Sequence, residues 1–308
     1  MAEVGLAIDG LVGVSIGALV GAGWAVGLDW RALAETALGL RRQDVAAVRR
    51  RALWLGGVRA PSLFDPSPFL AFLRRTLPPL SVEATAHPVR IAAVALGAGG
   101  VAWFGRGMAE GVPLVEAVYA SCALPPYFPP WEHNGERYGD GGLLDVLPVV
   151  AAAGWGARRL IVVDVGPEVQ PAPEASFWAR GMLAVLDRAL VLQFVQQRER
   201  ARRAATSLGP PVLWIRPRVV HLRGWTFDRT LYLLEEGYRA TREALAVADP
   251  AAFPEARSAS LPRSLAGPTR GTGAADPAVG TEHDDQDRQS RGAEAVAEPP
   301  HPERPRHP

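Results

Sequence analysis

Leu11-Val12-Gly13-Val14-Ser15-Ile16-Gly17 is the stretch that decides the fold, because it joins a short apolar run to a helical run through the pattern Gly-x-Ser-x-Gly. A serine in that pattern, after a strand and before a helix, is typical of a nucleophile elbow. The turn is too tight for side chains on either flank, which predicts glycine at both Gly13 and Gly17. Ser15 then lies at a helix N-terminus, where the Ile16 N–H can donate to an oxyanion.

A serine hydroxyl needs a base to become a nucleophile, and the usual base is histidine. The predicted folded part of the chain holds His87, His133 and His221. The first precedes a proline where a strand is expected to begin, the second lies in a polar turn, and the third follows an apolar pair near a strand end. These contexts favour structural or surface roles, and a role for His221 as the third member of a triad stays open.

Asp140 is the better partner for the serine. It lies in residues 138–144, Tyr-Gly-Asp-Gly-Gly-Leu-Leu. Gly141 and Gly142 allow a turn with positive φ and leave the carboxylate uncrowded. Turns of this kind are common, so Asp140 becomes a candidate base only together with the elbow at Ser15.

Apolar periodicity predicts strands that alternate with helices along the chain. The expected strands are 11–14, 88–96, 101–104, 159–165 and 212–215, and the expected helices begin at Ser15 or cover 31–40, 44–55, 114–121, 148–154, 177–203 and 229–247. Such alternation predicts an α/β sandwich around a largely parallel sheet.

Composition narrows the class of protein. The chain has 308 residues, of which 48% are hydrophobic and 21% charged, and a formal net charge of +1. These values fit a globular protein and exclude wholesale disorder, and they argue against a nucleic-acid partner. The single cysteine, Cys122, forms no internal disulfide and no structural zinc site, and no basic segment precedes the first apolar run. We expect a cytoplasmic protein.

The two ends of the chain differ in composition. We expect one folded domain over residues 1–257, with the motifs in residues 8–165. Residues 258–308 are rich in Pro, Gly, Ala, Arg, Asp and Glu and hold no aromatic residue. Such a segment cannot bury enough apolar surface to offset its ordering entropy, which predicts a disordered tail.

Three blocks, in this order, resemble the bacterial patatin-like phospholipases, a family of serine lipid acyl hydrolases. They are residues 8–22 around Ser15, residues 120–130 (Ala-Ser-Cys-Ala-Leu-Pro-Pro-Tyr-Phe-Pro-Pro), and residues 138–148 around Asp140. A strand expected at 160–165 follows them, as in the family. The combination covers most of the predicted domain and is far more specific than any one block.

The resemblance implies a three-layer α/β/α fold and a Ser15–Asp140 dyad that acts through an acyl-enzyme, with no metal or organic cofactor. The implied substrate is a lipid or small ester, and peripheral contact with the inner face of a membrane is left open. A carboxylate is a weak base at an ordinary pKa near ~4, so partial burial is expected to raise the pKa of Asp140.

One feature of the family is not matched. Its first strand and its Gly-rich loop, which supplies most of the oxyanion hole, have no counterpart among the residues before Ser15. Either the recorded start lies too late or this is a truncated copy. The alternative function is therefore a catalytically weak or inactive patatin-like binding or scaffold protein.

Two further alternatives concern the same residues. The uncharged stretch 10–28 is long enough to cross a bilayer, and its glycines have small-xxx-small spacing. An ordinary α/β-hydrolase triad would use Ser15, Asp164 and His221 in that order, but that fold places several strands before its elbow.

Overall fold

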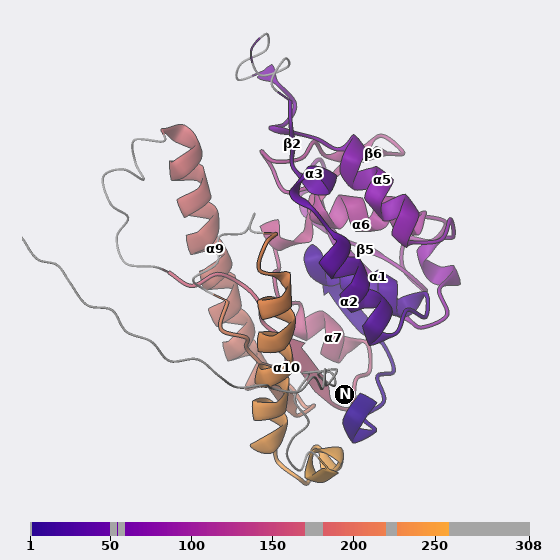
Figure 1. The fold of residues 1–308 in the computed structure, drawn as a ribbon, viewed down its shortest axis with the longest axis vertical. Coiled ribbons are helices and arrows are strands. Elements are labelled where there is room, and N and C mark those ends of the chain that lie inside the picture. Colours follow the sequence, from indigo (N-terminus) through magenta and orange to yellow (C-terminus); the bar gives the residue numbers. More distant parts are fainter. Residues whose placement is uncertain (1, 50–53, 55–58, 170–180, 220–226, 259–308) are drawn as a thin grey trace, which may run out of the picture. The chain divides into compact units, whose positions relative to one another are not determined.

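The elements around Ser15 form as the sequence predicts. In a computed structural model, which describes residues 2–49, 54, 59–169, 181–219 and 227–258, β1 (Leu11–Val14) leads through Ser15 into α1 (Ile16–Ala25) (Figure 1). α1 is rich in glycine and alanine and packs closely against β1. A Cβ added at Gly21 would lie 2.4 Å from a methyl group of Leu11, so glycine lets this side chain pack directly on the helix backbone.

The central sheet is organised by β4 (Val89–Ala95), its most buried strand. The other strands are β5 (Gly100–Phe104), β6 (Trp131–His133) and β7 (Glu136–Asp140). β5 pairs with residues 91–95 along one edge of β4. On the other edge, β1 pairs with residues 89–92 and β7 with residues 93–95. Val14 at the end of β1 lies opposite Ala92, and Asp140 at the end of β7 lies opposite Ala93. The two strand ends that carry the candidate site therefore meet on adjacent residues of β4.

The α/β class is confirmed, and the strand pairings add detail to it. β1 is parallel to β4, and β8 (Leu160–Val163) is parallel to β9 (Val212–Ile215), as a parallel-sheet pattern predicts. β4 pairs antiparallel with β5 and with β7, and β6 pairs antiparallel with β7. The hairpin β6–β7 turns at Asn134 and Gly135, both with positive φ, which suits a tight two-residue turn.

Helices cover the strands. They are α2 (Trp30–Gly39), α3 (Arg42–Val45), α5 (Ser67–Thr76), α6 (Leu114–Cys122), α7 (Val149–Gly154), α9 (Met182–Ala205) and α10 (Thr230–Ala246). Short 3-10 turns occur at Ala2–Val4, Val82–Ala84, Gly141–Leu143 and Pro254–Ser258. α1 and α6 pack against β4, whereas α7 packs against β8 and α9. Figure 1 shows α9 on one side of the chain, with α1, α5 and α6 on the other.

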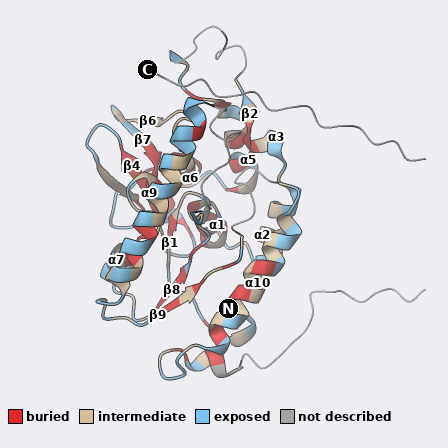
Figure 2. Cartoon of the chain, turned by 90° about the vertical axis from the view of Figure 1, so that its left-hand side faces the viewer, coloured by how far each residue is buried: buried red, intermediate tan, exposed pale blue. Residues whose placement is uncertain are grey.

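The main apolar core lies between the central sheet and the helices α1, α5 and α6. Ile91, Phe104, Leu114 and Val118 are almost completely buried in it. In Figure 2 β4 is red along most of its length, whereas α2 is tan and pale blue because none of its residues is buried. These elements all belong to one compact unit, Met1–Arg263.

One expectation from the sequence needs correction, one alternative is not supported by the described residues, and the predicted tail is not tested. The helix expected over 44–55 is wrong at its start, since α3 ends at Val45 and β2 (Ala47–Val48) then pairs with β3 (Phe64–Asp65). The stretch 10–28 is divided between β1 and α1, and among the described residues no helix combines the length and hydropathy that a bilayer span requires. The predicted tail lies outside the described residues beyond residue 258.

Candidate active site

Ser15 and Asp140, 125 positions apart in the sequence, are in direct contact. The Ser15 hydroxyl donates to Oδ2 of Asp140 at 2.7 Å. Ser15 has φ 53° and ψ −123°, a conformation that residues with a side chain rarely adopt. The surrounding structure must therefore impose this turn, and it turns the hydroxyl of the serine toward the carboxylate.

The glycines of the elbow have different roles. A Cβ added at Gly13 would lie 2.6 Å from Cα of Ala18 and 2.7 Å from the carbonyl oxygen of Gly17, so the turn needs glycine there. A Cβ added at Gly17 would meet nothing within 4 Å. The prediction that tight packing requires glycine on both flanks is therefore correct at Gly13 and wrong at Gly17, which borders open space.

The carboxyl group of Asp140 is buried and hydrogen-bonded. Asp140 is the last residue of β7, and only 4% of its surface is exposed. Its Oδ1 accepts from the N–H of Gly142 at 2.8 Å. Burial raises the pKa of Asp140 to about 6, although the hydrogen bonds from Ser15 and Gly142 act in the opposite direction. A carboxylate with that pKa is ionised at neutral pH and is a much better proton acceptor than an exposed aspartate.

The two glycines after Asp140 are needed for space and not for a positive φ. Neither Gly141 nor Gly142 has a positive φ, so the predicted reason for them is wrong. A Cβ at Gly141 would lie 2.6 Å from the carbonyl oxygen of Ala92, and one at Gly142 would lie 3.1 Å from the Asp140 carboxylate. Glycine lets this turn pass close to β4 and keeps the carboxylate free of side chains.

Ser121 was not predicted from the sequence, and it contacts the turn at Ser15. Ser121 is fully buried at the end of α6, where its hydroxyl accepts from the N–H of Ser15 at 2.9 Å and donates to the carbonyl of Ala92 at 2.6 Å. Two residues later, the carbonyl of Ala123 accepts from the N–H of Asp140 at 3.0 Å. One short segment therefore holds both Ser15 and Asp140. A serine within an apolar helix end, in the 120–130 block, was the signal available.

The first turn of α1 offers donors to a developing negative charge. The helical hydrogen bonds begin with the N–H groups of Ala18 and Leu19, which both donate to the carbonyl of Ser15. The amides of Ile16 and Gly17 precede them, at the positive end of the helix, where an anion is favoured. This is where the sequence places one donor of an oxyanion hole.

The other candidate groups take structural roles or lie elsewhere. His87 stacks on Trp24 with ring centroids 4.8 Å apart, and His133 stacks on Trp131 in the β6–β7 hairpin at 4.6 Å. His221 lies outside the described residues. Within the described ranges no group of His, Cys, Asp and Glu is arranged to hold a metal ion.

Asp164 and Cys122 are also accounted for. Asp164, the acid of the alternative triad, is paired with Arg198 in a buried ion pair. Burial raises the pKa of the Cys122 thiol, so this thiol stays protonated beside the elbow and does not compete as a nucleophile.

Exposed apolar side chains adjoin the dyad in sequence. Ile16 follows Ser15, Val20 lies one helical turn further along α1, and Leu144 lies four residues after Asp140. Their exposed fractions are 52%, 49% and 48%. An apolar substrate group could be received by such side chains better than a charged one.

Comparison with known proteins agrees with this site. The family model described as patatin-like phospholipase matches residues 1–153, which include both Ser15 and Asp140. Uncharacterised NTE family proteins of Mycobacterium bovis and of two Mycobacterium tuberculosis strains are each 34% identical over 176 residues. The match covers 56% of this chain and 45% of each relative, so the chain spans less than half the length of these relatives. This chain, with its Gly-x-Ser-x-Gly elbow and Asp-Gly-Gly turn in contact, belongs to the patatin-like phospholipase family.

Proposed function

We propose that the chain is a serine lipid acyl hydrolase in which Ser15 is the nucleophile and Asp140 the general base. The observation that carries this proposal is the 2.7 Å hydrogen bond from the Ser15 hydroxyl to Asp140, made by a serine in a strained turn at a helix N-terminus. The family match and the NTE family relatives support a lipid substrate.

The acylation step follows from this geometry. Ser15 Oγ attacks the ester carbonyl carbon while its proton passes to Oδ2 of Asp140. The negative charge on the carbonyl oxygen falls near the amides of Ile16 and Gly17. The carbon–oxygen bond to the leaving alcohol then breaks, and the alcohol takes the proton from Asp140.

In deacylation, water takes the place of the serine hydroxyl as the attacking group. Asp140 accepts a proton from the water that attacks the acyl-enzyme, the ester bond to Ser15 breaks, and Oγ of Ser15 recovers a proton as the fatty acid leaves. The exposed side chains of Ile16, Val20 and Leu144 would receive the acyl chain, and contact of the same face with a lipid surface belongs to this proposal.

The direct test is covalent labelling of the purified full chain. A fluorophosphonate probe should label the wild type and fail to label Ser15→Ala, and the wild type should release fatty acid from a short-chain aryl ester and from phospholipid vesicles. Absence of labelling and of turnover in the wild type would instead favour a binding or scaffold protein with an inactive site.

A further inference from the structure

The turn that carries the base is supported from a helix outside the residues that the family model matches. α9 begins at Met182, beyond the match to residues 1–153, and it lies against the turn at Gly142. A Cβ added at Gly142 would lie 3.8 Å from the ring of Phe194 on α9. The contact between α9 and this turn is therefore direct.

Gln197 of α9 binds this turn through three hydrogen bonds. Its Nε2 donates to the carbonyl of Gly142 at 3.1 Å and to the carbonyl of Leu143 at 3.2 Å. Its Oε1 accepts from the N–H of Val146 at 2.9 Å. With only 8% of its surface exposed, the side chain satisfies its amide almost entirely on these backbone groups.

Gly142 connects Gln197 to the carboxylate. The N–H of Gly142 donates to Oδ1 of Asp140, while its carbonyl accepts from Gln197. The N–H and the carbonyl of Gly142 belong to adjacent peptide groups on one Cα, so holding the carbonyl limits the directions that the N–H can take. Gly142 has no side chain to restrict its backbone, which leaves the hydrogen bonds to do so.

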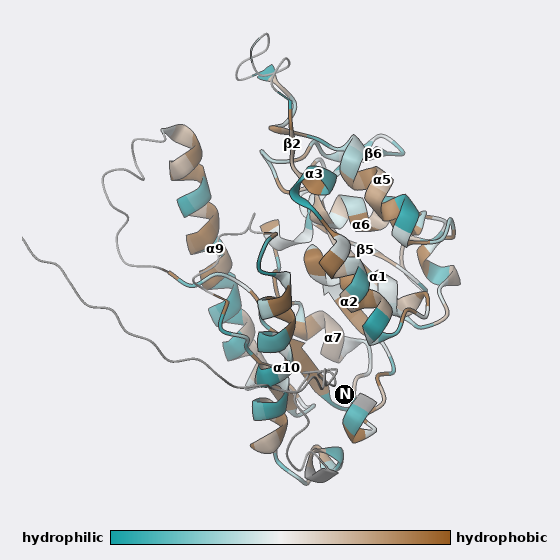
Figure 3. Cartoon of the chain, in the orientation of Figure 1, coloured by the Kyte–Doolittle hydropathy of each residue, from teal (hydrophilic) through white to brown (hydrophobic). Residues whose placement is uncertain are grey.

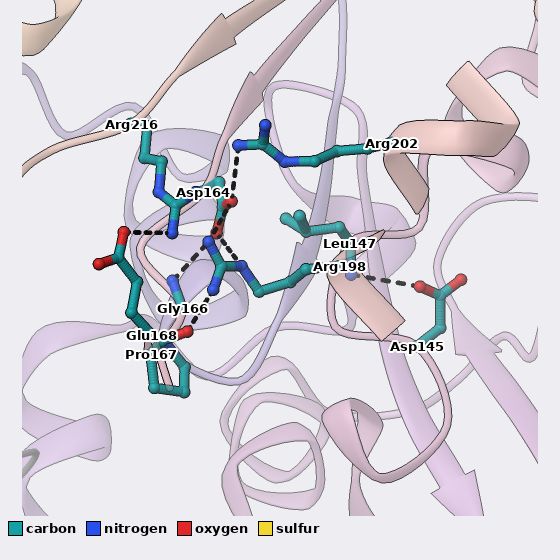
Figure 4. Close-up of polar contacts among 9 residues, drawn as sticks. All are labelled: Asp145, Leu147, Asp164, Gly166, Pro167, Glu168, Arg198, Arg202 and Arg216. Carbon is teal, nitrogen blue, oxygen red and sulfur yellow. Dashed lines mark hydrogen bonds and ion pairs between the residues drawn. The ribbon is translucent and has the colours of Figure 1, made fainter. Parts of the chain in front are cut away.

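The position of α9 is fixed next to Gln197. Arg198, the following residue, forms two hydrogen bonds of 2.7 Å with Asp164 at the end of β8, and the two side chains are 4% and 1% exposed. Arg198 also donates to the carbonyl of Pro167. Figure 4 shows Arg198 between Asp164 and Pro167, with Arg202 on the far side of the carboxylate. A buried pair of this kind does not slide by a helical turn without unpairing a charge.

We propose that Gln197 is a positioning residue of the active site, which holds the Gly142 peptide so that its N–H and the Ser15 hydroxyl share the two oxygens of the Asp140 carboxylate. α9, held by Asp164 and Arg198, thereby becomes part of the catalytic unit. The kinetic test of this inference rests on the proposed function, because it needs an active enzyme. The spectroscopic test, which follows the Asp140 carboxyl group, rests on the geometry alone.

The test replaces the amide with a side chain of similar length that cannot form hydrogen bonds. Gln197→Met in the full chain should lower kcat for a soluble aryl ester roughly tenfold to a hundredfold with KM within about twofold, because a misplaced base slows chemistry more than binding. Gln196→Met places the same substitution on the exposed face of the same helix and should leave kcat unchanged. Activities are expressed per site titrated with the fluorophosphonate.

A second readout does not depend on turnover. The ¹³C signal of the Asp140 carboxyl, followed against pH, should titrate at higher pH in Gln197→Met than in the wild type, because the carboxylate loses the Gly142 N–H. A wild type without activity would refute the proposed function, and this titration would still decide the role of Gln197.

The contrary results are equally defined. Wild-type kcat per titrated site and a wild-type Asp140 titration in Gln197→Met, even with a lower Tm, would mean that Gln197 only stabilises the fold. If that variant does not fold, Gln197→Leu removes both the donor for Gly142 and the acceptor for Val146 with a smaller apolar side chain. The same fall in kcat is expected there, and an unchanged kcat would overturn the proposal.

Discussion

The half of the molecule around β4 and the half around β8 and α9 are stabilised in different ways. The first is built on one large apolar cluster that joins α1, α5, α6 and β4. Among the described residues, the second has two small apolar clusters, and it contains the ion pairs Arg198–Asp164, Arg159–Glu255 and Arg216–Glu168. Figure 3 shows the hydrophilic C-terminal half of α9 in teal.

This difference indicates which polar groups serve chemistry. In the β4 half, the buried polar side chains Ser121 and Asp140 lie at the site, within a core that holds together without them. In the other half, the buried pair of Asp164 and Arg198 fixes a helix to a strand. Removing Ser121 or Asp140 should therefore change activity, whereas removing Arg198 or Asp164 should mainly cost stability. Gln197 of α9 belongs with the first group, because it binds the turn that follows Asp140.

The largest effect is expected for Ser15→Ala. Loss of the nucleophile should reduce ester turnover at least about 10³-fold, because no other side chain can form the acyl-enzyme. The free energy of unfolding should change little, or rise, since alanine removes only a half-buried hydroxyl in a strained turn. Turnover of an aryl ester and urea unfolding measure the two quantities. If the variant lost activity because it was unfolded, the contrast between the two halves of the molecule would not hold.

Asp140→Asn should follow, with opposite effects on activity and stability. Turnover should fall by about 10²–10⁴-fold because the amide cannot accept the serine proton. At pH 8 the variant should be more stable than the wild type by up to roughly 3 kcal/mol, because the wild type has to keep a carboxylate of raised pKa ionised in a buried site.

The pH dependence of that stability gain follows from the sign of the shift. The folded pKa of Asp140, about 6, lies above its unfolded value, so the wild type loses stability as pH rises from about 4 to 6. The advantage of Asp140→Asn should vanish below pH ~4 and be constant above pH ~6. Urea unfolding of both proteins across this range would show it, and an advantage that grew toward acid would be inconsistent with a raised pKa.

Arg198→Met tests the other half. It leaves the buried Asp164 carboxylate with the N–H of Gly166 and the more distant guanidinium of Arg202, at 3.5 Å, and should destabilise the fold by about 3–5 kcal/mol. Arg200→Met, at an exposed position of the same helix, is the matched control and should change stability by less than about 0.5 kcal/mol. The double variant with Asp164→Leu should recover most of the loss; failure to recover it would show that the pair does more than balance charge.

The smallest of these effects is expected for Ser121→Ala. The variant leaves the N–H of Ser15 and the carbonyl of Ala92 without their partner, at a cost of about 1–3 kcal/mol in stability. A relaxed elbow should also lower kcat about tenfold, because the nucleophile is less well directed. Thermal unfolding and steady-state kinetics separate these effects, and a variant with full activity would show that the strain at Ser15 is maintained by the sheet alone.

Local patterns pointed to the two residues that the structure brings into contact, but not to the contacts that assemble them. The strand, the turn and the helix around Ser15 follow from nearby residues, as does the choice of Asp140. The shared edge of β4 brings these two residues together and depends on pairings between distant strands. A side chain at Gly141 would collide with the carbonyl of Ala92, and the Ser121 hydroxyl donates to that same carbonyl. Both contacts join distant parts of the chain, so neither role is visible in a local stretch.

The second half was less predictable for a related reason. Strands and helices were expected near 159–165, 177–203 and 212–215, and elements occur there. The partner of Asp164 on α9 and the contact of Gln197 with the Gly142 turn depend on how a helix is docked. No spacing in the sequence encodes that docking.

The pH dependence of Ser15 labelling tests the Ser15–Asp140 dyad most directly. The rate at which a fluorophosphonate labels the wild-type chain should rise with pH to half its maximum near about pH 6, as Asp140 loses its proton, and then level off. Asp140→Asn should label slowly at every pH, without that step. A wild-type step that survives in Asp140→Asn, or a wild type that is not labelled at all, would contradict the account.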